Sequence, residues 1–374
     1  MKIAIVQGAF LPVPPRRGGA VEKIWLGLGR EFARRGHEVL HVSRLCDGLP
    51  AEEEAGGVRY RRVRGADAPG SRLLLKWQDL LYTRRVAAML PKSDLVVTNT
   101  FWAPLVLRPE RHGPLWVHVQ RYPHGQMKHY RRAARLQTVS RVIQRAIIAE
   151  APQFAERVLV IPNPLPDGHT GPPVRARDPD LVLYTGRVHP EKGLDLLLSA
   201  MIRLRQARPE TRLRIVGPWQ EQYGGAGEAY LRKLRAQAEP LGRAVEFTGP
   251  VFGEGGLAAH YDEAAVFVYP SLAEKGEASP VAPLEAMAHG LPIVLSDLEC
   301  FDDTVAGGIF SRSFNHRAVA APARLAGVIE GILDQPGSWP AMAEAARARA
   351  AEFSLDRIAT RYLEAFAALV PAAR

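Results

Sequence analysis

The sequence predicts an α/β protein with two doubly wound, Rossmann-like domains that face each other across a cleft. The prediction rests on the length of 374 residues, on short apolar runs that alternate with longer amphipathic segments, and on one break in that alternation near residue 170. A domain usually spans roughly 100–200 residues, so two domains are expected. Strands that alternate with helices are typical of parallel sheets covered by helices.

The first forty residues show a strand–helix–strand pattern. Residues 2–6 are a short apolar run suited to a buried parallel strand, and a loop rich in glycine and proline follows over residues 8–19. Apolar side chains in residues 20–35 recur with the spacing of one helix face, and residues 37–43 return as a strand. Gly36 is suited to end the helix, so this segment predicts a first crossover unit.

The alternation continues to residue 161. Further strands are expected at residues 58–63, 95–98, 115–119 and 158–161, and helices at residues 71–90 and 132–150. Residues 163–173 have no periodicity and contain four prolines. This composition predicts a linker between the domains.

The pattern restarts after the linker. Strands are expected at residues 181–184, 212–216, 245–248, 266–269 and 293–295, and helices at residues 193–207, 229–239, 257–263, 283–289, 322–334, 339–352 and 355–370. We therefore expect a first domain over residues 1–165, a linker over 166–179 and a second domain over 180–354. Ligands of open parallel sheets bind at the carboxyl ends of the strands, so the cleft is the expected ligand site.

Cysteine usage and apolar runs exclude several classes of protein. Cys46 and Cys300 lie far apart and form no C-x-x-C pair, so neither a disulfide framework nor a structural zinc site is expected. The first apolar run breaks at Gly8, and no stretch approaches 18 uncharged apolar residues. We expect a cytoplasmic protein, peripheral at the inner face of a membrane at most.

The net charge of +10 is unevenly distributed. Residues 1–165 contain 27 Lys and Arg against 13 Asp and Glu, a formal +14, and the rest of the chain is formally −4. Such asymmetry indicates an anionic partner, although arginines spread over solvated helix faces would give the same count.

The first glycine-rich loop differs from a dinucleotide-binding fingerprint. Gly8 lies ten residues before Gly18 and Gly19, whereas the fingerprint needs three closely spaced glycines, so a NAD-dependent dehydrogenase is disfavoured. Gly18 and Gly19 precede a helix and would let backbone N–H groups approach an anion. A helix entry that needs small residues would explain them equally well.

Two basic residues lie where the first strand of the second domain ends. Arg187 follows Gly186 at that end, and Lys192 closes the turn before the next helix. Such a pair can hold a diphosphate, Arg through two parallel hydrogen bonds and Lys as a point charge. Two basic residues in a turn can also simply be solvated.

Two glutamates, Glu277 and Glu285, flank the start of a helix that begins near Val281. Backbone amides at a helix N-terminus suit a phosphate, and carboxylates accept hydrogen bonds from sugar and ribose hydroxyls. The spacing alone is weak support, because chance pairs of glutamates are common in this chain.

Taken together, these segments resemble the retaining glycosyltransferases of the GT-B fold, family 4. The matching segments run in family order over nearly the whole chain: 18–22, 35–39, 161–163, 186–193, 213–217, 245–249, 269–271 and 276–294. The resemblance implies transfer of a sugar from a UDP- or GDP-linked donor to a glycan, lipid-linked or small-molecule acceptor, in cell-envelope polysaccharide or glycoconjugate synthesis. It implies that the first domain binds the acceptor and the second the donor.

The resemblance also implies roles for individual residues. Arg187 and Lys192 are similar to the pair that neutralises the leaving diphosphate, Glu277 to the glutamate that contacts the donor sugar, and Glu285 to the glutamate that binds the ribose. The implied donor-binding set is Gly18, Gly19, Gly186, Ala278, Ser279, Pro280, Val281 and Glu285.

The chain departs from the family pattern after the first glutamate. The family usually has a Gly-aromatic-Gly run where this chain has residues 278–280, and Pro280 has no N–H to donate to a phosphate. Glu274 is an alternative to Glu277 as the glutamate that contacts the sugar. Glu277 is favoured because it keeps the eight-residue offset to Glu285.

A histidine at the end of a strand in the first domain usually contacts the donor sugar in this family. His118 is the candidate for this catalytic position, and strand alternation puts Gln120 on the same face. Gln120, Arg121 and His124 are possible contacts of the acceptor or the donor sugar. A strand histidine can equally be a packed core residue.

No metal or other cofactor is expected. The single D-x-D sequence, Asp178 to Asp180, falls at the end of the linker, and the His and Cys residues lack metal-ligand spacing. Arg187, Lys192 and helix amides can stabilise the leaving group without a metal.

Other functions remain open. A sugar-nucleotide epimerase or phosphorylase would need an acid/base pair that the sequence does not clearly offer. A non-catalytic basic protein could use a cationic stretch against anionic lipid: Arg121, Lys128, Arg131, Arg132, Arg135, Arg141 and Arg145. No nucleic-acid motif accompanies this stretch, so nucleic acid is not an expected partner.

The last helix carries apolar residues on one side, among them Tyr362 and Phe366. The resemblance implies that residues 355–374 cross back to the first domain. It also implies a cleft that closes when the donor binds.

Overall fold

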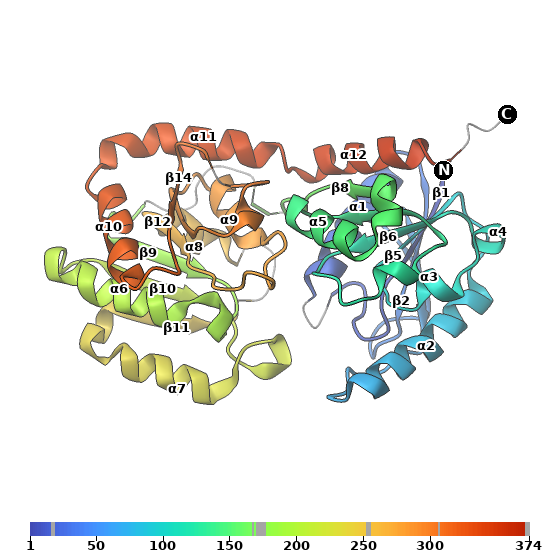
Figure 1. The fold of residues 1–374 in the computed structure, drawn as a ribbon, viewed down its shortest axis with the longest axis horizontal. Helices are drawn as coiled ribbons and strands as arrows, with labels where there is room; N and C mark the ends of the chain where they lie inside the picture. Colours follow the sequence, from blue (N-terminus) through green and yellow to red (C-terminus); the bar gives the residue numbers. More distant parts are fainter. Residues whose placement is uncertain (16–18, 167, 170–176, 252–255, 306, 371–374) are drawn as a thin grey trace. The chain divides into compact units, whose positions relative to one another are not determined.

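The computed structural model describes residues 1–15, 19–166, 168–169, 177–251, 256–305 and 307–370. The chain divides into two compact units (Figure 1). Unit 1 comprises Met1–Pro164 with Leu355–Arg374, and unit 2 comprises Leu165–Ser354. Each is an α/β unit built on its own sheet, which confirms the predicted fold class.

Unit 1 contains an eight-stranded sheet in the order β3-β4-β2-β1-β5-β6-β7-β8, with β3 antiparallel to β4 and every other neighbouring pair parallel. Its strands are β1 (Lys2–Val6), β2 (Glu38–Arg44), β3 (Glu52–Ala55), β4 (Val58–Val63), β5 (Leu95–Thr98), β6 (Leu115–Val119), β7 (Ala133–Thr138) and β8 (Val158–Val160). Its α-helices are α1 (Ala20–Arg34), α2 (Arg72–Met89), α3 (Ala103–Val106), α4 (Pro109–His112), α5 (Arg141–Glu150) and α12 (Leu355–Ala367).

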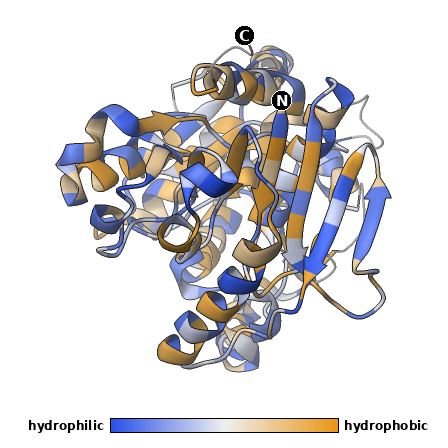
Figure 2. Cartoon of the chain, turned by 90° about the vertical axis from the view of Figure 1, so that its right-hand side faces the viewer, coloured by the Kyte–Doolittle hydropathy of each residue, from blue (hydrophilic) through white to orange (hydrophobic). Residues whose placement is uncertain are grey.

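The inner strands of this sheet are apolar, whereas its edge is charged. Ile3 of β1 pairs with Val39 of β2 on one side and with Leu95 of β5 on the other, and all three are buried. The edge strand β3 was missing from the predicted elements because its sequence is Glu52–Ala55, three glutamates and an alanine. Charge at an edge strand opposes pairing with another chain. In Figure 2 this edge strand is blue, its neighbour β4 has both blue and orange segments, and strands farther into the sheet are mostly orange.

The predicted helix over residues 132–150 is wrong. Ala133–Thr138 forms β7, which pairs with β6 and β8, and only Arg141–Glu150 is helical. Residues such as Ala, Arg, Leu and Gln favour helices locally, but burial between two neighbouring strands overrides that weak preference. The predicted cationic stretch is therefore divided between different elements and is not one continuous helical surface.

Helix α12 completes the core of unit 1 although it lies far along the chain. Phe366 contacts Trp116 of β6 and Phe32 of α1, with ring centroids 4.8 and 5.7 Å apart. Tyr362 contacts Trp25 of α1 at 5.3 Å. All five rings are buried in one cluster, so the apolar side of this helix is covered by the first part of the sequence.

Unit 2 contains a six-stranded sheet in the order β11-β10-β9-β12-β13-β14, all parallel. Its strands are β9 (Leu181–Thr185), β10 (Arg212–Val216), β11 (Val245–Gly249), β12 (Val266–Tyr269), β13 (Ile293–Ser296) and β14 (Ser311–Phe314). Its α-helices are α6 (Leu194–Ala207), α7 (Gly227–Gln237), α8 (Ala258–Glu263), α9 (Val281–Ala288), α10 (Ala321–Leu333) and α11 (Trp339–Ala351). The strand β14 was not predicted, since its two middle residues are exposed Arg312 and Ser313.

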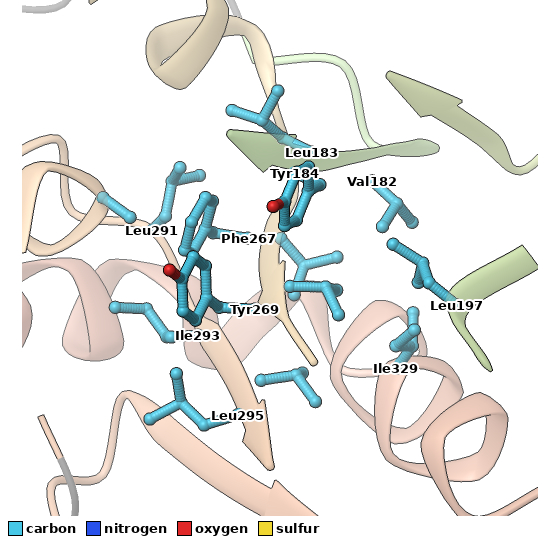
Figure 3. Packing of buried hydrophobic residues seen from close by; sticks show 14 of the residues in the cluster. Val182, Leu183, Tyr184, Leu197, Phe267, Tyr269, Leu291, Ile293, Leu295 and Ile329 are labelled. Atoms are coloured by element: carbon cyan, nitrogen blue, oxygen red, sulfur yellow. The ribbon is translucent and has the colours of Figure 1, made fainter. Parts of the chain in front are cut away.

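The centre of this sheet positions the site. Figure 3 shows part of this core: Tyr184 of β9 lies beside Phe267 and Tyr269 of β12, and Val182 of β9 lies toward Leu197. The tyrosine rings lie nearly parallel, with centroids 5.9 Å apart. The chain leaves β9 toward β10 on one side and returns to β12 on the other, so the strand order reverses between β9 and β12. Open parallel sheets bind ligands at such a point, at the carboxyl ends of the strands.

Candidate functional site

Three segments of unit 2 meet at the carboxyl ends of β9 and β12. The first follows β9 and contains the short 3-10 helix Pro190–Lys192, the second follows β12, and the third is the start of α9. Gly193 joins the first two segments: its φ is +71°, and a Cβ there would lie 2.0 Å from the carbonyl oxygen of Pro270. Only glycine allows this close approach, which fixes the position of the neighbouring Lys192.

Lys192 and Glu277 form a buried ion pair within this site. Their side chains are 7% and 6% exposed, and Nζ of Lys192 donates to Oε1 of Glu277. The same carboxylate oxygen accepts hydrogen bonds from Ser271 Oγ at 2.8 Å and Tyr269 OH at 3.0 Å. Three donors thus hold one oxygen of Glu277, Oε1.

Arg187 lies beside this pair and is held by two acceptors. Its guanidinium donates to Glu191 Oε1 at 2.7 Å and to the carbonyl oxygen of Gly224 at 2.8 Å. Glu191 Oε1 also lies 3.7 Å from Lys192 Nζ. The four charged groups therefore alternate in sign in the order Arg187, Glu191, Lys192 and Glu277. The structure brings the two predicted cations together, and each already has an anionic partner. Glu191, Ser271 and Tyr269 were not among the predicted site residues.

The N-terminus of α9 offers few backbone donors. Pro280 is its N-cap residue, and Pro283 occupies the third helical position. Proline has no N–H, so only Val281 and Ala282 keep backbone donors among the first four groups that lack helical partners. The preceding residues Ala278 and Ser279 are buried. The backbone donor that was predicted to be missing at Pro280 is therefore one of two, because Pro283 also has no N–H.

Glu285 lies one turn inside α9 and is held by side chains from other elements. Its Oε2 accepts a hydrogen bond from Tyr261 OH at 2.6 Å, and the same hydroxyl lies 2.6 Å from Thr185 Oγ1 at the end of β9. Burial, with the charge of Glu285 nearby, raises the pKa of Tyr261 well above its usual range. This phenol is therefore a permanent donor that orients the carboxylate.

Two histidines connect Glu285 to a second carboxylate. His169 Nε2 lies 3.4 Å from Glu285 Oε1, and its Nδ1 lies 3.2 Å from Nε2 of His289. His289 Nδ1 lies 2.6 Å from Asp262 Oδ1. The two imidazoles therefore form a chain of polar contacts between the carboxylates of Glu285 and Asp262.

The sequence did not predict this histidine network. Its members come from separate segments: His169 from the predicted linker, Asp262 from α8, Glu285 from α9, and His289 from the C-cap position that follows α9. Only the i, i+4 spacing of Glu285 and His289 is a local signal, and it places both on one face of the helix.

Glu274, the alternative to Glu277, faces a different group of residues. It is exposed and pairs with Arg317 at 2.7 Å and His316 at 3.6 Å. The guanidinium of Arg317 lowers the pKa of the Glu274 carboxyl. The geometry thus places Glu277, and not Glu274, beside Lys192.

The candidate residues of unit 1 lie at the carboxyl end of β6. His118 is buried, with Nδ1 2.5 Å from Gln137 Oε1 of β7 and its ring edge-on to Trp25 at 5.4 Å. Burial lowers the pKa of His118, so the ring is neutral at physiological pH. Gln120 donates to Asn163 Oδ1 at 3.3 Å. The structure thus shows a packed, hydrogen-bonded histidine in which the unpredicted strand β7 supplies the partner.

The start of α1 contacts the same region of unit 1. Gly19 has a φ of +109°, and a Cβ there would lie 2.3 Å from Glu22 Oε2; Gly18 lies outside the described residues. Burial raises the pKa of Glu22, while its own backbone N–H and the charge of Arg121 oppose the shift. Arg121 and His124 are exposed.

In the part of the chain that the structure describes, no group of three or more His, Cys, Asp or Glu side chains could hold a metal ion. The D-x-D carboxylates are paired with arginines: Asp178 with Arg212, and Asp180 with Arg208. Across the described ranges, no helix combines the length and apolar character needed to cross a bilayer.

Family models match both units. The model described as "Glycosyl transferases group 1" matches residues 179–335, and the model described as "Glycosyl transferase 4-like domain" matches residues 19–164. Between them they cover most of the chain, and Gly18 and His169 lie outside both matched ranges.

Among curated proteins, a D-inositol 3-phosphate glycosyltransferase from Streptomyces coelicolor is 32% identical over 221 residues, which is 57% of this chain and 47% of that protein. The chain thus spans about half the length of the curated relatives it matches.

The fold is shared by many solved structures, among them the following two. Sucrose-phosphate synthase from Thermosynechococcus elongatus has a TM-score of 0.79 at 21% identity, covering 100% of both chains. Alr3699/HepE from Anabaena, in complex with UDP-glucose, has a TM-score of 0.73 at 20% identity, covering 98% of this chain and 100% of that one.

Proposed function

The chain belongs to the group 1 glycosyltransferases with the GT-B fold, and on this premise we propose that it transfers a sugar from a nucleoside-diphosphate donor to an acceptor hydroxyl with retention of the anomeric configuration. The observation that carries this proposal is the buried Lys192–Glu277 pair beside Glu285, at the point of unit 2 where the strand order reverses.

The donor would lie against unit 2. Arg187 and Lys192 would face its diphosphate, together with the backbone N–H groups of Val281 and Ala282. Glu285, oriented by Tyr261, would accept hydrogen bonds from the ribose hydroxyls. A UDP-sugar is the first donor to test, since the similar fold of Alr3699/HepE holds UDP-glucose; a GDP-sugar is the alternative.

In the reaction, the bond between the anomeric carbon and the terminal phosphate oxygen breaks as the acceptor oxygen bonds to the same face of that carbon. The acceptor proton leaves with the nucleoside diphosphate. Negative charge grows on the diphosphate in the transition state, and fixed cations stabilise it without reorganising. Glu277 would hold sugar hydroxyls through Oε2, because three donors already occupy Oε1.

The acceptor would bind unit 1. The strongly basic first part of the sequence favours an acceptor that is anionic or presented at an anionic membrane, such as a lipid-linked glycan. Gly19 would face the diphosphate, and His118, Gln120, Arg121 and His124 are the proposed contacts of the acceptor or the donor sugar. The resemblance gives the same position to Gly18. No metal is proposed for the reaction.

Titration calorimetry with UDP, GDP and UDP-glucose tests donor binding. We expect one of the diphosphates to bind the wild type and Glu285→Gln to weaken this binding at least about tenfold, since a hydrogen bond to a charged group contributes roughly 1.5–3 kcal/mol. Glu344→Gln is the matched control, because Glu344 is exposed on α11. Equal binding by both variants would refute the role of Glu285, and no binding of any nucleotide would refute the donor site.

A further inference from the structure

The helix α2 presents apolar side chains to solvent. Leu73, Leu74 and Trp77 are 82%, 45% and 55% exposed, although large apolar residues are usually covered. Their spacing, i, i+1 and i+4, puts them on one side of the first turns. The opposite side packs against unit 1 through Tyr82 and Val86, so the helix is apolar on both sides.

The exposed charged side chains of α2 have one sign: they are Arg72, Lys76, Arg84 and Arg85. Its single acidic residue, Asp79, is buried on the inner side. Arg84 lies eleven residues after Leu73, three helical turns along the same side. Arg84 also lines a hollow with Glu110, Arg108 and Arg111, in which basic side chains outnumber the acidic one. The exposed side of α2 is therefore an apolar strip with mostly basic neighbours.

The helix is fixed in this orientation by contacts to the rest of unit 1. Trp102 Nε1 donates to the carbonyl oxygen of Lys76 at 2.7 Å, and the Lys76 ammonium lies 4.9 Å from the centre of the Phe101 ring. Farther along, Arg85 donates to the carbonyl oxygen of Arg64 at 2.8 Å. These contacts lie at both ends of the helix and keep Leu73 and Trp77 pointing outward.

We propose that the outer face of α2 docks on an anionic lipid bilayer, with Leu73, Leu74 and Trp77 inserted among the headgroups and the guanidinium groups of Arg72 and Arg84 beside lipid phosphates. Apolar residues flanked by Lys and Arg are the features of helices that lie in a membrane interface, and tryptophan favours that depth. Docking needs no transfer chemistry, and it would bring unit 1 to a lipid-presented acceptor.

Charge complementarity favours a bilayer over a second copy of the chain. A two-fold contact between two α2 helices would bring Arg72 and Arg84 of both copies together, and α2 has no exposed carboxylate to pair with them. Such like charges repel, whereas an anionic surface attracts each cation by about 1 kcal/mol, roughly fivefold in binding.

Flotation of the full chain with vesicles tests the docking. We expect binding to vesicles of equal parts phosphatidylglycerol and phosphatidylcholine, and at least about tenfold weaker binding to phosphatidylcholine alone, because removing the anionic lipid removes the attraction of several cations. The double variant Leu73→Ser/Trp77→Ser should weaken binding to the anionic vesicles at least about tenfold through lost apolar burial. Both side chains are exposed, so the unfolding temperature should stay close to that of the wild type.

Matched control variants in unit 2 distinguish binding through the outer face of α2 from a general effect of lost apolar area or lost positive charge. Val319→Ser removes a fully exposed apolar side chain from unit 2 and should leave binding unchanged. Arg72→Gln/Arg84→Gln should weaken binding more than Arg232→Gln/Arg243→Gln, which removes the same charge from exposed positions of unit 2.

Three outcomes would overturn the docking: wild-type binding by the Leu73→Ser/Trp77→Ser variant, no binding to anionic vesicles, or a dimer in sedimentation that this variant dissociates. Donor binding, measured by calorimetry, should be the same in this variant and the wild type, so failure of the docking is distinguishable from failure of the proposed transfer.

Discussion

Lys192 and Glu277 are 85 residues apart in the sequence and form a buried ion pair where β9 and β12 end side by side. Ser271 and Tyr269 also donate hydrogen bonds to Oε1 of this carboxylate. A buried charge left without its partner is costly, so the stability of unit 2 should depend on the same pair that we propose to bind the donor.

Replacing Lys192 should therefore damage stability as well as donor use. Lys192→Met leaves the Glu277 carboxylate without its cation, and we expect the free energy of unfolding to fall by about 3–5 kcal/mol. Glu277→Gln should cost less, because Lys192 keeps the Glu191 carboxylate at 3.7 Å and an amide oxygen still accepts from Ser271 and Tyr269. Urea unfolding measures both.

The control for this prediction is Lys233→Met, which breaks the more exposed pair of Lys233 with Asp195. Exposed pairs contribute about 1 kcal/mol or less. An equal loss in Lys233→Met and Lys192→Met would contradict the buried-pair account.

The histidine network should act on donor affinity. His169→Leu removes the ring nitrogen that lies 3.4 Å from Glu285 Oε1, and we expect the dissociation constant of the nucleoside diphosphate to rise at least about tenfold. His169→Gln keeps an N–H donor of similar reach and should bind within about threefold of the wild type, well inside that tenfold loss. Calorimetry at one pH measures both. His129→Leu, at an exposed position of unit 1, is the control. If the Leu and Gln variants bind equally well, the contact of His169 with Glu285 does not orient the carboxylate.

Asp79 should make the stability of unit 1 fall as the pH rises. Burial raises the pKa of Asp79 to about 6, although backbone N–H groups of Trp102 and Phe101 oppose the shift. Between pH 4 and pH 6 the folded chain holds a proton that the unfolded chain has lost, so stability decreases with pH through this window. At 1.36 kcal/mol per pKa unit, the free energy of unfolding should fall by roughly 2–3 kcal/mol across this window.

Asp79→Asn should remove this contribution. The difference in unfolding free energy between the variant and the wild type should grow in favour of the variant from pH 4 to pH 6 and then stay constant. Burial lowers the pKa of His41 to about 3, which gives the opposite slope in both proteins and cancels in the difference. Asp47→Asn, at an exposed position, should show no such trend. A pH-independent difference for Asp79→Asn would contradict the prediction.

Phe366 should matter for the folding of unit 1 although it lies near the end of the chain. Phe366→Ala removes a buried ring from the cluster with Trp116 and Phe32, and we expect a loss of about 3–5 kcal/mol in thermal or urea unfolding. Glu364→Ala, exposed on the same helix, should cost less than about 1 kcal/mol. Similar losses in both variants would mean that α12 does not contribute to the core.

The sequence predicted the fold class well because most of its strands are strongly apolar runs separated by helical periods. The prediction of strands failed where pairing with neighbouring strands decides the structure. Ala133–Thr138 consists mostly of residues that favour helices, yet it forms an inner strand. The strands Glu52–Ala55 and Ser311–Phe314 are too polar to be recognised from the sequence. In these segments the neighbouring strands outweigh local preference.

The site was predictable only as far as its motifs extend. Local patterns picked out Arg187, Lys192, Glu277 and Glu285, which the structure assembles within unit 2. The groups that hold them were not predictable, because His169 and Tyr261 reach Glu285 from segments 116 and 24 residues away in the sequence. Side-chain contacts between distant segments leave no periodic signal in one sequence.

The most direct test of the proposed transfer is product analysis by NMR. Purified full-length protein is incubated with UDP-glucose or a GDP-sugar and a panel of glycan and lipid-linked acceptors in anionic vesicles, with and without excess EDTA. We expect release of the nucleoside diphosphate together with a product whose new linkage keeps the α configuration of the donor. The rate of this reaction should be the same in EDTA. In Glu285→Gln, release of the diphosphate and formation of the product should both be strongly reduced. An inverted linkage would contradict retention, and loss of turnover in EDTA would contradict metal independence.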